Sequence, residues 1–213
     1  MKYELLHLKQ FFPKLGMQSG DPLVKVYLPD NLTEMGRGDE QHPCLIVCPG
    51  GAYEFCSQRE AEPIAFHFLP EGFNVFVLLY SVAPHHYPAQ QCEVAALIEL
   101  INQNADTWHC DTGRIALMGF SAGGHLAAQY ATSYDSSAIR AVIPNSKPVQ
   151  ATVLGYPVIT AEPKWTHQIS MTALTGKTIV HQMSLIYFLV RSTFAQIRRQ
   201  LFCGILRKMN ASR

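Results

Sequence analysis

A serine flanked by closely spaced glycines is the residue in this sequence whose setting most suggests catalysis. Residues 119–123 read G-F-S-A-G, a G-x-S-x-G pattern centred on Ser121. At a sharp strand-to-helix turn, such a serine has a strained backbone and an exposed hydroxyl. Acyl transfer requires a nucleophile of this kind, a general base, a group that orients the base, and donors for the oxyanion. Ser121 is therefore the candidate nucleophile, and Gly119 and Gly123 complete a nucleophile elbow.

The residues on either side of Ser121 would have to position it. The apolar run 115–118 precedes the motif, and residues 125–131 have the composition of a helix. The same pattern occurs by chance in other glycine-containing turns, so the motif alone is weak evidence. A strand before it and a helix after it make the elbow the better interpretation.

A second glycine pair, Gly50-Gly51, could supply the oxyanion donors. It follows the continuous apolar run 44–48 and precedes Ala52. Taken alone, this pair is equally typical of an ordinary turn after a buried strand. Together with the elbow, it predicts that the backbone N–H of Ala122 and an N–H of Gly51 or Ala52 bind the oxyanion.

Alternating strand and helix patterns predict an α/β fold with a mostly parallel sheet covered on both faces. The apolar runs are of the kind that parallel sheets bury on both faces. Ligands of such folds bind beyond the carboxyl ends of the strands, where Gly50-Gly51 and Ser121 both lie. The expected elements are strands at 24–28, 44–48, 75–80, 114–118 and 151–156, and helices at 60–69, after Pro88 through Ile101, and at 125–131.

The composition is that of a globular domain without a strong charge. The 213 residues are 48% hydrophobic and 15% charged, with a net charge of +1, so no overall field attracts nucleic acid or an anionic membrane. The first residues show no secretory signal, and we expect a cytoplasmic protein. The six cysteines form no C-x-x-C pair and no zinc-like spacing, so no metal site is expected. The sequence does not indicate an oligomeric state.

Several blocks, in order, resemble the acetyl esterase and acetylxylan-esterase-like branch of the α/β-hydrolases. The similarity extends from about residue 24 to 177. It implies an α/β-hydrolase fold, with residues 1–177 as its core, and a serine carboxylesterase that needs no cofactor. The implied substrates are small acyl esters, including acetyl groups on sugars. The matching blocks are residues 48–53, 59–65, 76–81, 87–88, 119–127, 154–160 and 174–177.

The resemblance stops at residues 178–213, which form a basic tail outside the family pattern. Family members carry their catalytic acid in a segment like T-P-P-T-F-L-W-H-T-x-x-D, and their histidine in a later H-G pair. Regrouping permissible codons of the tail recovers that segment, and residues 196–205 spell P-D-T-P-P-T-F-L-W-H in the other frame. Our hypothesis is a single-base deletion near the codons of Thr178 and Ile179. We then expect a core that lacks its C-terminal strands and helices, without the triad Asp and His, and weak or absent activity.

Other residues leave alternatives open. His125 lies one turn past Ser121 but matches a family position that is not the base. Histidines in loops are more often solvated than catalytic, and two of them could border the pocket. A non-catalytic remnant or binding module, and a protein that binds membranes through its tail, remain alternatives to an enzyme. The further candidates are His85 and His86 beside the pocket, His167 and His181 without a placement, and Asp106, Asp111 and Asp135 as local hydrogen-bonding groups.

Overall fold

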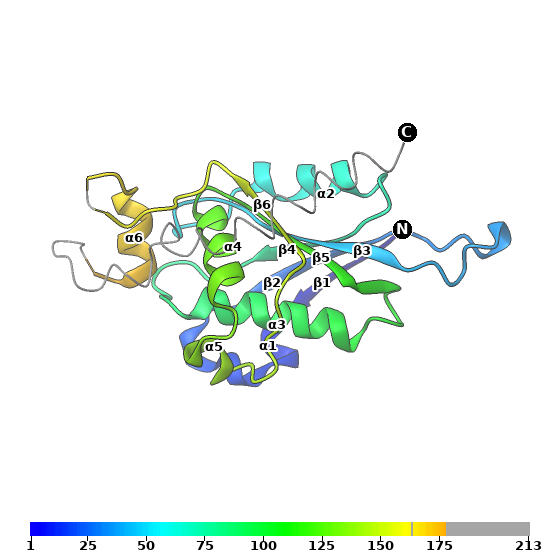
Figure 1. Cartoon of the computed structure of the whole chain (residues 1–213), viewed down its shortest axis with the longest axis horizontal. Coiled ribbons are helices and arrows are strands. Elements are labelled where there is room, and N and C mark those ends of the chain that lie inside the picture. Colours follow the sequence, from blue (N-terminus) through cyan, green and yellow to red (C-terminus); the bar gives the residue numbers. More distant parts are fainter. Residues whose placement is uncertain (163, 178–213) are drawn as a thin grey trace.

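A computed structural model describes residues 1–162 and 164–177, which are built around a six-stranded sheet (Figure 1). The strand order is β1-β2-β4-β3-β5-β6. Strands β3 to β6 run parallel to one another, whereas β2 pairs antiparallel with both β4 and the edge strand β1. The strands are β1 (Lys2–His7), β2 (Leu23–Leu28), β3 (His42–Cys48), β4 (Asn74–Leu79), β5 (Cys110–Phe120) and β6 (Ala151–Gly155).

Helices cover both faces of this sheet. Helix α2 lies on one face, while α3 runs across the other with α1 and α5 beside it (Figure 1). Helix α6 stands apart from the sheet, beyond the ends of the strands. The helices are α1 (Leu8–Phe11), α2 (Glu62–Phe68), α3 (Ala89–Gln103), α4 (Ser121–Ser133), α5 (Ser137–Arg140) and α6 (Gln168–Thr175), with short 3₁₀ helices η1 (Pro13–Gln18), η2 (Thr33–Met35) and η3 (Gln58–Glu60). In this part of the chain, no helix has the length and apolar character needed to cross a membrane.

The apolar strands bury both of their faces because successive side chains point to opposite sides of the sheet. In β3, Ile46 and Cys48 belong to the core under α3 and α4, whereas Leu45 and Val47 belong to the core under α2. Strand β4 divides its side chains in the same way. This double burial confirms the interpretation of the continuous apolar runs as strands of a parallel sheet.

The predicted elements are present, with differences at their ends. The helix expected at 60–69 is divided, because the backbone at Ala61 (φ −109°, ψ −100°) is not helical and separates η3 from α2. Helix α4 begins at Ser121 itself, four residues before the expected start. Strand β1 was not predicted, since charged residues interrupt its apolar pattern and it needs β2 as its partner. The interpretation of residues 178–213 lies outside the described residues.

Candidate active site

Ser121 lies at the junction of β5 and α4 with a strained backbone. Its φ of 50° is in the left-handed region, which residues other than glycine rarely adopt. The turn is tight because β3, β5 and α4 approach one another at glycines. A Cβ on Gly123 would lie 2.1 Å from the carbonyl oxygen of Cys48, and one on Gly119 would lie 2.1 Å from that of Gly123. This strand-turn-helix geometry is the one expected of a nucleophile elbow.

The loop after β3 faces Ser121 and has an unusual backbone. Gly51, Ala52 and Tyr53 have consecutive positive φ values of 132°, 57° and 60°. The loop closes on itself because the N–H groups of Glu54 and Phe55 donate to the carbonyl oxygen of Gly51, at 2.9 and 3.1 Å. The amides of Gly51 and Ala52 are not the donors in these closing bonds.

Buried aromatic side chains hold this loop from beneath. The Tyr80 hydroxyl donates to the carbonyl oxygen of Pro49 at 2.6 Å, and the Tyr53 hydroxyl lies 2.8 Å from Nδ1 of His125. The N–H of Ala83 donates to the carbonyl oxygen of Tyr53 at 2.8 Å. Burial raises the pKa of the Tyr53 and Tyr80 phenols well above the ordinary value, so both stay protonated. The conformation of the loop is therefore held by hydrogen bonds of side chains in the hydrophobic core.

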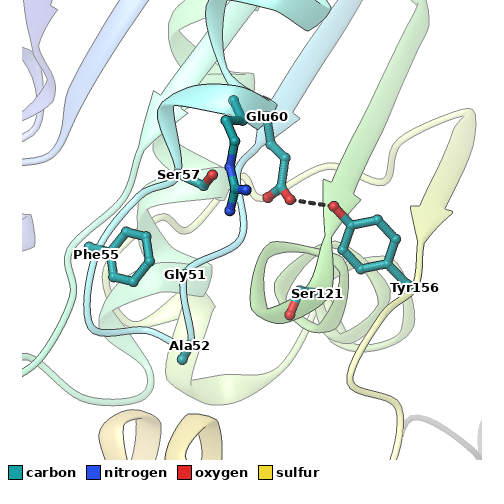
Figure 2. Close-up of a pocket in the computed structure, with 8 residues that line it drawn as sticks. Gly51, Ala52, Phe55, Ser57, Glu60, Ser121 and Tyr156 are labelled. Carbon is teal, nitrogen blue, oxygen red and sulfur yellow. Dashed lines mark hydrogen bonds between the residues drawn. The ribbon is translucent and has the colours of Figure 1, made fainter.

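The loop, the elbow and the end of β6 enclose a pocket of about 210 Å³ (Figure 2). Figure 2 shows Ser121 between Ala52 on one side and Tyr156 on the other. Of the sequence-predicted site residues, Gly51, Ala52 and Ser121 line the pocket. Ala122 is fully buried in the first turn of α4 and is not one of the residues that line the pocket. The remaining lining residues are Phe55, Ser57, Arg59, Glu60 and Tyr156.

Sequence reasoning did not identify these other lining residues. Tyr156 follows β6, and the rule that ligands bind at the carboxyl ends of strands was a signal that could have found it. Glu60 carried no such signal, because its contacts depend on how η3 folds back over the loop after β3.

None of the described histidines lines the Ser121 pocket. His125 is fully buried against Tyr53 beneath the loop. Nδ1–H of His86 donates to the carbonyl oxygen of Ala173 at 2.8 Å, and His86 lines a separate cavity of about 620 Å³. Of the two loop histidines that could have bordered the Ser121 pocket, His86 lies instead beside α6 at that other cavity. The remaining candidates are His85, which packs near Gly20, His167, whose Nδ1 lies 2.8 Å from Oγ of Ser170, and His181, which lies outside the described residues.

The acidic candidates and the possibility of a metal ion can be considered together. The carboxylate of Asp111 accepts the N–H of Gly113 at 2.9 Å and also pairs with Arg114, which is the local role expected of a turn residue. Within residues 1–162 and 164–177, no group of three or more His, Cys, Asp or Glu side chains could hold a metal ion.

The family model described as BD-FAE matches residues 25–184, about three quarters of the chain. The chain belongs to this family. It is 30% identical to an endo-1,4-β-xylanase B of Butyrivibrio fibrisolvens over 164 residues. The aligned region covers 70% of this chain and 24% of that protein. It is 27% identical to an acetylxylan esterase of Xylanibacter ruminicola, over 74% of this chain and 30% of that protein. This BD-FAE chain therefore spans less than a third of either relative.

A solved structure supports the fold of this BD-FAE chain. An α/β-hydrolase enzyme from a Medee basin deep-sea metagenome library is 33% identical and superposes with a TM-score of 0.64. The match covers 78% of this chain and 61% of that one. The predicted α/β-hydrolase fold and the resemblance to esterases of this superfamily are confirmed.

Proposed function

We propose that the chain is built for hydrolysis of small carboxylic esters, with Ser121 as the nucleophile and acetyl esters of sugars as the substrate class. The observation that carries the proposal is the placement of Ser121, at a positive φ, in one pocket with Gly51 and Ala52. The names of the relatives, a xylanase and an acetylxylan esterase, support the choice of acetylated sugars.

The chemistry follows from the elbow and the loop. Oγ of Ser121 attacks the acyl carbon, the bond to the leaving alcohol breaks, and the alcohol takes up the serine proton. Water then hydrolyses the acyl-serine and releases the carboxylic acid. The amides of Gly51, Ala52 and Ala122 are the proposed donors to the oxyanion. In support, the hydrogen bonds that close the loop use the amides of Glu54 and Phe55 instead.

The size of the pocket favours short acyl groups. Its volume of about 210 Å³ is the volume that roughly seven water molecules occupy in the liquid. An acetyl group and part of its alcohol fit such a space, whereas a long acyl chain would extend into solvent.

The base is the weak part of the proposed machinery. Because no described histidine lines the pocket, we propose that turnover is slow. An oxyanion hole and substrate binding alone retain roughly 10³-fold to 10⁴-fold acceleration over water in serine hydrolases that have lost triad residues. The same observation favours the second candidate function, a non-catalytic remnant that binds esters in the pocket without turning them over.

Hydrolysis of p-nitrophenyl acetate by the purified chain and by its Ser121→Ala variant separates the two functions. An enzyme gives turnover that disappears in the variant. Equal background rates in both proteins would reject catalysis and leave the binding function. Binding would then be tested by asking whether p-nitrophenyl acetate protects residues of the pocket from chemical labelling.

A further inference from the structure

We infer that Glu60 is a positioning residue that holds the loop after β3, which carries the proposed oxyanion donors, and Tyr156 on the opposite wall of the pocket in one arrangement. Its Oε2 accepts the N–H of Gly50 at 2.7 Å, and its Oε1 accepts the hydroxyl of Tyr156 (Figure 2). One carboxylate thus joins the loop that follows β3 to the residue that follows β6. The kinetic part of this inference rests on the proposed function, whereas its structural part does not.

Gly50 is held from both sides by the segment that carries Glu60. The N–H of Ser57 donates to the carbonyl oxygen of Gly50 at 2.8 Å, while Glu60 accepts the N–H of the same residue. A Cβ on Gly50 would lie 2.7 Å from Oε2 of Glu60 and 3.1 Å from Cβ of Ser121. The carboxylate therefore approaches the backbone directly, and a hydrogen bond to a charged acceptor is stronger than a neutral one.

The residues after Gly50 are the proposed oxyanion donors. Rotation of the peptide before Gly50 would turn the amides of Gly51 and Ala52 away from the position of an acyl oxygen. Because oxyanion stabilisation depends on donors that are already oriented, fixing Gly50 lets Glu60 act on the transition state without touching the substrate.

Tyr156 is the second group that Glu60 holds. Its side chain is 67% exposed, so the core does not fix its hydroxyl, although its ring lies 5.9 Å from that of Phe120. The hydrogen bond to Glu60 raises the pKa of the Tyr156 phenol above its ordinary value. The next turn is tied to the elbow, since the N–H of Val158 donates to the carbonyl oxygen of Ser121 at 3.1 Å.

Both carboxylate oxygens of Glu60 are thus engaged, which suits a positioning role better than that of a general base. The two contacts can be broken separately. Glu60→Ala removes both, Tyr156→Phe removes only the wall contact, and Glu60→Gln keeps an oxygen for Gly50 and an NH₂ that can donate to the Tyr156 hydroxyl. Glu71→Gln, at an exposed position after α2, is the matched control for the change from acid to amide.

Two NMR measurements test the structural part without any need for activity. We expect the phenol pKa of Tyr156, assigned by comparison with Tyr156→Phe, to fall toward its ordinary value in Glu60→Gln and Glu60→Ala but not in Glu71→Gln. We expect the Gly50 amide resonance to move in Glu60→Ala and to stay near its wild-type position in Tyr156→Phe. The inference would be overturned if both the phenol pKa of Tyr156 and the Gly50 amide resonance were unchanged in Glu60→Ala.

Kinetics with p-nitrophenyl acetate test the functional part. We expect kcat to fall by up to about a hundredfold in Glu60→Ala, the cost of displacing catalytic groups by about 1 Å, and to recover partly in Glu60→Gln. Tyr156→Phe should change KM more than kcat. An unchanged kcat in Glu60→Ala, with Ser121-dependent turnover in the wild type, would contradict the inference. In a chain without such turnover the proposed function fails, and the two NMR measurements decide the inference.

Discussion

The floor and the rim of the pocket are built in different ways. The floor, formed by Gly51, Ala52 and Ser121, is fixed by contacts with the core, where the hydroxyls of the buried residues Tyr53 and Tyr80 hold the loop. The rim carries Phe55 and Tyr156, whose side chains are 57% and 67% exposed. A change in the floor must disturb the core, whereas a change in the rim need not. Substitutions in the floor should therefore change the stability of the fold, and substitutions in the rim should change the substrate preference.

The largest effect is expected where the floor meets the backbone of β3. Gly123→Ala places a Cβ 2.1 Å from the carbonyl oxygen of Cys48, and overpacking of a core costs about 1–3 kcal/mol. We expect a loss at or above the top of that range, measured as a lower urea midpoint, together with loss of Ser121-dependent turnover. Gly113→Ala is the control, because its Cβ would meet only the Asp111 side chain at 3.2 Å. Equal midpoints for the two variants would show that the elbow has room to relax.

A buried carboxyl behind the floor predicts a pH dependence of stability. Glu93 in α3 accepts the N–H of Ser81 at 2.8 Å, and burial raises its pKa to about 7. The folded state therefore holds this proton more tightly than the unfolded state. Since the unfolded pKa is about 4.3, stability falls as the pH rises from there to 7, by on the order of 3 kcal/mol.

Glu93→Gln should remove this slope and raise stability at neutral pH. The measurement is urea unfolding of both proteins across this pH range. Glu99→Gln, on the same helix at a less buried position, should retain the wild-type slope. A slope that survives Glu93→Gln would assign the pH dependence to other groups.

A smaller effect is expected from the strained backbone of the nucleophile itself. Glycine adopts a positive φ without the strain that serine has at 50°, and residues in such regions cost about 1–3 kcal/mol. Ser121→Gly should therefore abolish turnover and raise stability, whereas Ser121→Ala should abolish turnover without that gain. Calorimetric melting of the two variants checks this, and a less stable Ser121→Gly would show that the serine side chain itself supports the floor.

The smallest effect on stability is expected at the rim. Phe55→Ala removes an exposed ring and should change the free energy of unfolding by no more than about 0.5 kcal/mol. Because Phe55 lines the pocket, the same variant should raise KM for aryl esters several-fold. Phe66→Ala, at a similarly exposed phenylalanine on α2, should leave KM unchanged. A stability loss in Phe55→Ala as large as that of Gly123→Ala would remove the distinction between floor and rim.

The sequence was sufficient to predict the parts of the fold that depend on local patterns. The apolar runs predicted β3 and β5, because both faces of these strands are buried, and G-x-S-x-G predicted the elbow, because only glycines allow the close approach at Gly123. The sequence did not predict β1, whose pairing with β2 compensates for a weak pattern of its own.

The site was predictable to the same limited extent. Gly51, Ala52 and Ser121 were predicted from their positions after strands and lie in one pocket. Glu60 was assigned to a helix, although the break at Ala61 turns η3 back toward Gly50, ten residues earlier. Such a contact depends on tertiary packing, and neither propensity nor spacing signals it. The same holds for His86, which is hydrogen-bonded to Ala173 of α6 and lines a different cavity.

Acylation of Ser121 is the measurement that tests the central claim most directly. The chain is incubated with p-nitrophenyl acetate, quenched in acid, digested and analysed by mass spectrometry, alongside Ser121→Ala. A stable acyl-enzyme is expected because the proposed oxyanion donors Gly51 and Ala52 line the pocket with Ser121, whereas no described histidine lines it to speed deacylation. We expect one acetyl group on the peptide that contains Ser121 and none on the corresponding peptide of the variant. An unmodified Ser121, with label spread over lysines equally in both proteins, would contradict it.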